Sequence, residues 1–124
     1  MNEILLYIGS GVIISWGIAH LIPTKAIVNG FGAISEDNKK ILAMESIAEG
    51  LTLIFLGVLA LLVTLAGGYD DTVSRVVLWA TATMLLVMAL LTQLTGARTS
   101  SLPYKICPFV KTAVAILLIL AVVL

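Results

Sequence analysis

The fold class follows from residues 41–66, ILAMESIAEGLTLIFLGVLALLVTLA, which carry only two charged side chains, Glu45 and Glu49. A transmembrane helix uses about 20 apolar residues, so this stretch is long enough to cross a bilayer. The composition of the 124-residue chain agrees, with 60% hydrophobic residues, 11% charged residues and a mean hydropathy of +1.16. Soluble domains are only about half apolar. We therefore predict an integral membrane protein.

Three further apolar stretches have the length of a membrane span. The connections between them are short, which leaves no room for a second domain. We predict an all-α fold, a polytopic integral membrane four-helix bundle that forms a single membrane domain over residues 1–124. The predicted spans are residues 4–22, 41–66, 73–95 and 108–124.

The connections carry the residues that start and stop helices. Pro23 ends the first span, and two glycines break any helical pattern in residues 23–35. Ser35 is a good N-cap and is followed by two acids, so the second helix should begin before the membrane does. Pro108 suits the first turn of the last helix. We therefore expect residues 97–107 to form a loop.

The basic residues predict the orientation in the membrane, because Lys and Arg are retained on the cytoplasmic side of short loops. Arg75 belongs to the connection between the second and third spans. The other six belong to the first and third loops and the adjoining helix ends: Lys25, Lys39, Lys40, Arg98, Lys105 and Lys111. We predict a multi-pass protein of the cell (inner) membrane with both termini outside the cytoplasm. The first span should stay in the mature protein, because no basic segment typical of a signal peptide precedes it.

Few polar side chains fall inside the predicted spans, and these are the candidate functional residues. Each charge in hydrocarbon costs several kcal/mol unless it is paired, hydrated or able to reach water. At a helix rise of about 1.5 Å per residue, polar groups from all four spans lie at a similar depth near the cytoplasmic end. The predicted ligand-binding or proton-binding set consists of Trp16, His20, Glu45, Glu49, Gln93 and Lys111.

Each member of this set has a chemical role and a plainer alternative. Glu45 and Glu49 are four residues apart on one helix face, so their charges repel and favour a proton or cation site. His20 would be a donor or proton relay, and Lys111 a counter-charge. Alternatively, the two acids mark the emergence of the helix into headgroups, Lys111 extends to water, and His20 only packs.

The remaining two candidates are uncharged. Gln93 would offer a neutral hydrogen-bonding group, and Trp16, one turn deeper than His20 on the same face, would contact an apolar ligand. Either side chain could also be a packing or interfacial residue.

Several chemistries lack support in the sequence. Cys107 is the single cysteine, so an internal disulfide and a cysteine-built zinc site are excluded. No hydrolase or phosphate-binding motif is present, so no enzyme is expected and the cofactor is left unspecified. The seven basic and seven acidic residues balance, which offers no basic surface for nucleic acid. No metal motif appears, and the alternative metal ligands would be His20, Glu45 and Glu49.

Small residues predict where helices approach each other. Gly11, Ser15 and Ala19 recur every four residues on the first helix, and Gly50 and Gly57 lie on the second. Small side chains let helix backbones come close in a membrane. We expect both sets to pack within the chain.

The first half of the chain resembles the DoxX-like group of small four-helix membrane proteins. The matching features are the segment 9–21 with Gly17 and His20, and the second-span pattern Met44-Glu45, Gly50, Leu53 and Gly57. The resemblance implies a subunit or helper protein associated with membrane redox chemistry, and it places interest on Glu45. The small multidrug-resistance transporters are similar in size, but their first-helix glutamate has no counterpart here, so Glu49 would have to replace it.

These observations predict a binding or accessory module for a lipophilic ligand or a partner membrane subunit, with the lipid bilayer as its surroundings. The alternatives are a small proton-coupled transporter acting as a homodimer, and a purely structural bundle. Helix rotation decides among them, and periodicity does not fix it when every face is apolar.

Overall fold

A computed structural model describes residues 2–124, and its elements are helices throughout. The four long helices are α1 (Asn2–Leu21), α3 (Glu36–Gly67), α4 (Thr72–Leu94) and α5 (Leu102–Val123). Two short elements, α2 (Thr24–Asn29) and the 3-10 helix η1 (Gly96–Arg98), lie in the connections. Each long helix is long and apolar enough to cross a membrane. The predicted all-α polytopic bundle is therefore confirmed as the fold class.

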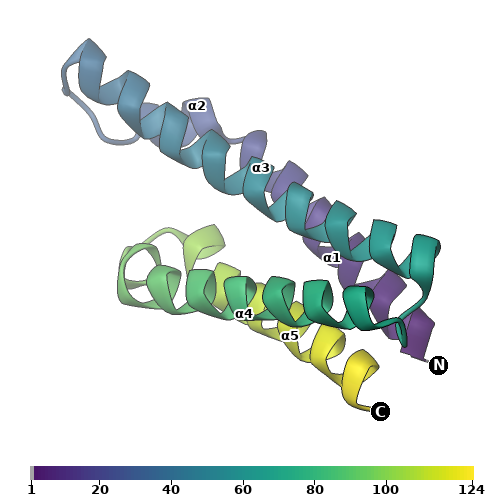
Figure 1. The fold of residues 1–124 in the computed structure, drawn as a ribbon. Coiled ribbons are helices and arrows are strands. Elements are labelled where there is room, and N and C mark those ends of the chain that lie inside the picture. The colour runs from purple at the N-terminus through teal and green to yellow at the C-terminus, as the bar shows by residue number, and fades with distance from the viewer. Residues whose placement is uncertain (1) are drawn as a thin grey trace.

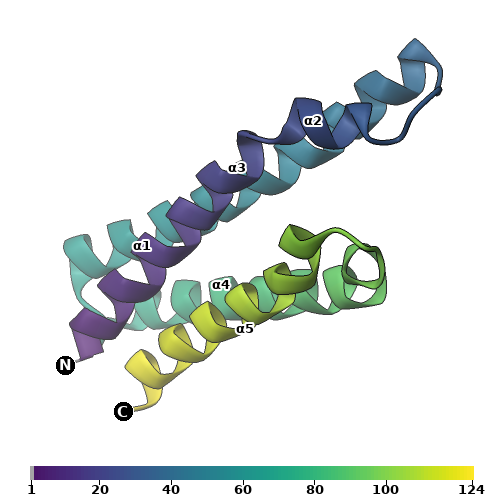
Figure 2. The same ribbon diagram turned by 180° about the vertical axis from the view of Figure 1, so that it is seen from behind.

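The long helices form two antiparallel pairs, α1 with α3 and α4 with α5 (Figure 1). The pairs are joined mainly through α1 and α5, whereas α3 and α4 touch sparingly. Both views show the two pairs close together at the end that holds the two termini and diverging toward the end that holds α2 and η1 (Figure 2). We call these the closed end and the open end.

The close packing of α1 on α3 depends on facing glycines. Gly17 and Gly50 lie opposite each other, and a Cβ on Gly17 would come within 2.8 Å of the Gly50 carbonyl oxygen. Gly57 is equally crowded, because a Cβ there would lie 2.6 Å from Ile14 Cγ1. The predicted contact role of Gly50 and Gly57 is confirmed.

The small-residue stripe predicted for the first helix is wrong. Gly11, Ser15 and Ala19 are exposed, and a Cβ on Gly11 would meet no atom within 4 Å. Ser10 and Gly17, on another face of α1, are buried instead. Both faces of this apolar helix carry small residues, so the spacing alone could not choose between them.

The predicted start of the second helix is confirmed. Ser35 is the N-cap of α3, and its side-chain oxygen accepts a hydrogen bond from the Asn38 backbone amide at 3.1 Å. The helix then runs for 32 residues, about 48 Å at the usual rise, whereas the hydrocarbon core is only about 30 Å thick. The helix is therefore longer than a membrane span requires, and its first turns lie at the open end.

Two predicted connections contain more helix than expected. Residues 23–35 contain the helix α2, which forms because the glycines come only after Asn29. α5 begins at Leu102, with Pro103 in its first turn, so Pro108 lies inside the helix. A proline in the first turn loses no helical hydrogen bond, and Pro103 fills that place one and a half turns earlier than predicted. Residues 102–107 are consequently helix and not loop.

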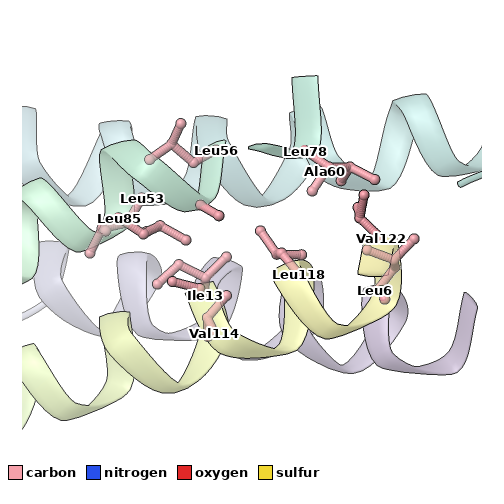
Figure 3. Close-up of a cluster of buried hydrophobic side chains, with 13 residues drawn as sticks. Leu6, Ile13, Leu53, Leu56, Ala60, Leu78, Leu85, Val114, Leu118 and Val122 are labelled. Atoms are coloured by element: carbon pink, nitrogen blue, oxygen red, sulfur yellow. The ribbon is translucent and has the colours of Figure 1, made fainter. Parts of the chain in front are cut away.

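The core between the helices is apolar. In Figure 3, side chains from all four long helices point toward one another, among them Ile13, Leu53, Leu85, Val114 and Leu118. Each of these is at most 1% exposed. The outward faces are also apolar, with large exposed side chains such as Phe55, Leu62, Val87 and Phe109. A chain that is apolar on both faces of its helices suits a lipid surrounding.

Candidate functional site

The centre of the polar site is an ion pair between α5 and α3. The Lys111 Nζ atom donates to Glu49 Oε1 and, at 2.8 Å, to Thr92 Oγ1 of α4. Lys111 is 0% exposed, whereas the Glu49 side chain is 26% exposed. A lysine buried among apolar helices needs such a partner, because an unpaired charge is expensive there. The alternative that Lys111 extends to water is wrong, and its position fits the predicted counter-charge.

His20 brings α1 to the same site from its last turn. Its Nε2 atom lies 3.8 Å from Glu49 Oε2 and 3.7 Å from Cys107 Sγ. The imidazole is buried at 8% exposure. The other ring nitrogen, Nδ1, is also buried and has no hydrogen-bond partner among residues 2–124. The two nitrogens of one ring therefore have different surroundings, one facing polar groups and the other unsatisfied.

Cys107 is the site residue that sequence reasoning placed wrongly. It was expected in a loop, yet it lies on α5, fully buried, and its Sγ accepts a hydrogen bond from Trp16 Nε1 at 3.2 Å. Tyr104, one turn earlier, packs edge-to-face against His20 with ring centroids 5.8 Å apart. The spacing 104, 107 and 111 is that of one helix face, so extending the last helix back to Pro103 would have revealed the cluster.

Two predicted members do not join this cluster. Glu45 is exposed on α3, one turn from Glu49, and lines a neighbouring cleft without contacting His20 or Lys111. Gln93 is exposed on α4 and lies beside Phe109 in an outward groove. Its neighbour Thr92 points inward in its place, because consecutive residues lie about 100° apart around a helix.

A cleft of about 530 Å³ adjoins the ion pair at the open end. Its walls come chiefly from α3 and α4, which touch little, and from α2. The polar side chains along it include Glu45, Ser46, Glu49, Thr92 and Thr95. Glu49 therefore contacts Lys111 on one side and faces this cleft on the other.

A second space, of about 250 Å³, lies between α1, α2 and the first turns of α5. We call it the aromatic pocket. It is largely apolar and is lined by Trp16, His20, Ile27, Pro103, Tyr104 and Ile106, among others. His20 thus borders this pocket as well as the polar cluster.

The fold and this site define a polytopic helical membrane protein with a buried ion pair and a histidine that borders an apolar pocket. No protein-family model matches the chain, and no curated protein or solved structure matches it significantly. The resemblance to the DoxX-like group stays a prediction.

Proposed function

We propose that this protein is a binding module for a lipophilic ligand, held in the aromatic pocket with a polar group against His20. The observation that carries the proposal is the buried Nδ1 atom of His20, which has no partner within the described chain and belongs to a residue that lines this pocket. A buried polar atom left without a hydrogen bond costs about 1 to 3 kcal/mol. A ligand whose polar group reached Nδ1 after a small rotation of the imidazole would recover that free energy.

The composition of the aromatic pocket supports a flat or aliphatic ligand. Ligand pockets are mostly apolar and carry a few polar groups that fix orientation, and here Trp16 and Tyr104 provide the large apolar surfaces. The volume of about 250 Å³ suits one ring or a short chain segment. The rest of a larger lipid would lie between the exposed apolar side chains outside.

The decisive experiment fills the pocket without touching the ion pair. Ala19 lines the pocket and is exposed, so Ala19→Phe places a ring there. Ala80→Phe adds the same ring to an exposed position of α4 that does not line the aromatic pocket. Mass spectrometry of extracts from purified protein should find a stoichiometric lipophilic compound with the native chain and Ala80→Phe, and lose it with Ala19→Phe. Equal extracts from all three would contradict the proposal.

A partner membrane subunit could fill the same pocket with a side chain of its own, which would make the protein an accessory module. The resemblance to the DoxX-like group favours this form, with a partner active in membrane redox chemistry. Purification in mild detergent would then yield a second polypeptide, and Ala19→Phe would release it.

Proton-coupled transport by a homodimer is the second candidate, and the ion pair favours it. Glu49 contacts a buried lysine and borders the cleft, so a substrate in the cleft would lie beside the ion pair. Glu49→Gln should abolish proton-driven flux into vesicles, and Glu45→Gln, on the same helix and cleft, should preserve it. Flux that survives Glu49→Gln would rule this candidate out.

We also propose that both termini lie outside the cytoplasm, in the cell (inner) membrane. Lys111 is buried and no longer counts for orientation, but five basic residues remain at the open end, in α2, η1 and the first turns of α3 and α5: Lys25, Lys39, Lys40, Arg98 and Lys105. Arg75 lies near the closed end, in the first turn of α4. Alkaline phosphatase fused after Leu124 should be active, and a fluorescent protein fused there should be dark.

A further inference from the structure

We propose that His20, Glu49 and Cys107 form a binding site for a divalent transition metal ion of the zinc type. One ligand atom from each residue lies within 4.8 Å of the other two. The three come from α1, α3 and α5, so the site exists only after the bundle has folded. The sequence had suggested Glu45 as the third ligand, and Cys107 takes that place.

Two of the three separations between these atoms are close to those of tetrahedral coordination, and the third requires a movement of the Glu49 side chain. Zinc binds histidine nitrogen and carboxylate oxygen at about 2.0 to 2.2 Å and thiolate sulfur at about 2.3 Å, so neighbouring ligand atoms in a tetrahedron lie about 3.5 Å apart. The Nε2 atom of His20 is 3.7 Å from Cys107 Sγ and 3.8 Å from Glu49 Oε2. These two separations exceed the tetrahedral value by a few tenths of an ångström, whereas the Glu49 oxygen and Cys107 Sγ, which lie within 4.8 Å, must approach each other by up to about 1.3 Å.

Neighbouring side chains orient the proposed ligands, as the hydrogen-bond partners of metal ligands do in known metal sites. Trp16 Nε1 donates to Cys107 Sγ and so fixes the position of the sulfur. Lys111 occupies Oε1 of Glu49, so Oε2 is left facing His20. Binding would displace the thiol proton, and the thiolate and carboxylate would together match the two positive charges of the ion. Glu49 would then no longer neutralise Lys111, whose other hydrogen-bond partner is Thr92, so the ion must compete with the ammonium for the carboxylate.

The set of donor atoms and the surroundings indicate which ion would bind. Sulfur together with imidazole nitrogen selects zinc-like ions over magnesium or calcium, which prefer oxygen alone. The cleft beside Glu49 reaches this one ligand from outside the bundle. Three protein ligands leave a fourth position open, as in zinc sites that bind water or substrate.

This inference does not rest on the proposed function. The metal would use Nε2 of His20, whereas the lipophilic ligand would use Nδ1, so either site can be occupied without the other. Ala19→Phe, which fills the aromatic pocket, should leave metal binding unchanged.

The test uses the full chain in detergent, purified through a tag that contains no histidine, with Co²⁺ as the probe. We expect one Co²⁺ per chain and a near-ultraviolet absorption band from thiolate-to-cobalt charge transfer. Cys107→Ser should remove the band, Glu45→Gln should retain it, and Trp16→Phe should weaken binding by about tenfold. A native chain without the band, or a Cys107→Ser chain that keeps it, would overturn the proposal.

A second measurement decides the matter if Cys107→Ser does not fold. Zinc X-ray absorption of the native chain, loaded with one equivalent of Zn²⁺, should show one sulfur neighbour together with nitrogen and oxygen neighbours. A spectrum with nitrogen and oxygen neighbours alone would exclude Cys107 as a ligand and end the proposal.

Discussion

The two ends of the bundle are held together by different means. At the closed end, Leu6, Ala60, Leu78 and Val122 pack side by side from the four long helices (Figure 3). At the open end the helix pairs diverge, and the Lys111 to Glu49 ion pair links α5 to α3 beside a cleft that Glu49 lines. Membrane helices gain little from hydrophobic burial, so close packing and polar contacts must hold them. Apolar packing therefore holds the closed end, and polar contacts between helices hold the open end.

The largest effect is expected from breaking the ion pair on one side only. Lys111→Met should lower the free energy of unfolding by about 4 kcal/mol, because it leaves the Glu49 carboxylate without its partner. The matched control is the double variant Lys111→Met with Glu49→Leu, which removes both charges and should recover most of the loss. Unfolding in mild detergent measures both. Equal losses in the two variants would mean that packing, and not charge, matters at the open end.

Shortening a side chain in the apolar core tests how much close packing contributes to stability. Leu118 is 1% exposed and Leu120, two residues later on α5, is 39% exposed. Leu118→Ala should lower the free energy of unfolding by about 3 kcal/mol, because a cavity remains. The Leu120 side chain faces outward, so Leu120→Ala should change the free energy of unfolding little. A similar loss for both would show that the core is less tightly packed than Figure 3 indicates.

Adding one methyl group tests the contact between α1 and α3. Gly17→Ala would place a carbon 2.8 Å from the Gly50 carbonyl oxygen, a backbone atom that cannot move aside alone, and should cost about 2 kcal/mol. Gly11→Ala, on the same helix with no atom within 4 Å, is the control and should be neutral. Thermal unfolding in detergent separates the two. If Gly17→Ala leaves thermal unfolding unchanged, α1 and α3 must lie farther apart than the structure places them.

The smallest effect concerns a neutral hydrogen bond at the open end. The Oγ1 atom of Thr24 lies 3.3 Å from Ser46 Oγ and joins α2 to α3. Thr24→Val keeps the shape and removes the hydroxyl, so it should cost about 0.6 kcal/mol, the average for hydrogen bonds between membrane helices. Thr52→Val is the control, because its exposed hydroxyl bonds only within its own helix. A loss as large as that of Lys111→Met would contradict the primary role of the ion pair.

The helices and their ends could largely be predicted, since local chemistry sets them. Apolar runs of one bilayer thickness must become helices in lipid because their backbone groups have no other partners, and Ser35 starts α3 as expected. The local predictions that failed were those in which two residues of the sequence suited the same role equally well. Pro103 and Pro108 both suit a first turn, and Gly11 and Gly17 both suit a helix contact.

The depth of the candidate site in the bundle was predicted, but only some of its residues were. Counting along each helix placed His20, Glu49 and Lys111 in one layer, and they do meet. Gln93 failed because its rotation about α4 was unknown, and Thr92 contacts Lys111 in its place. Cys107 was undervalued because the start of α5 was set too late.

The sequence by itself determined a helical membrane protein with few intramembrane charges, and it determined their height, because residue count and helix rise fix depth along the bilayer normal. Only the tertiary structure decided which side chains face one another. Rotation of each helix about its axis depends on packing between facing glycines and on pairing of buried charges, and neither leaves a periodic signal in a chain whose every face is apolar.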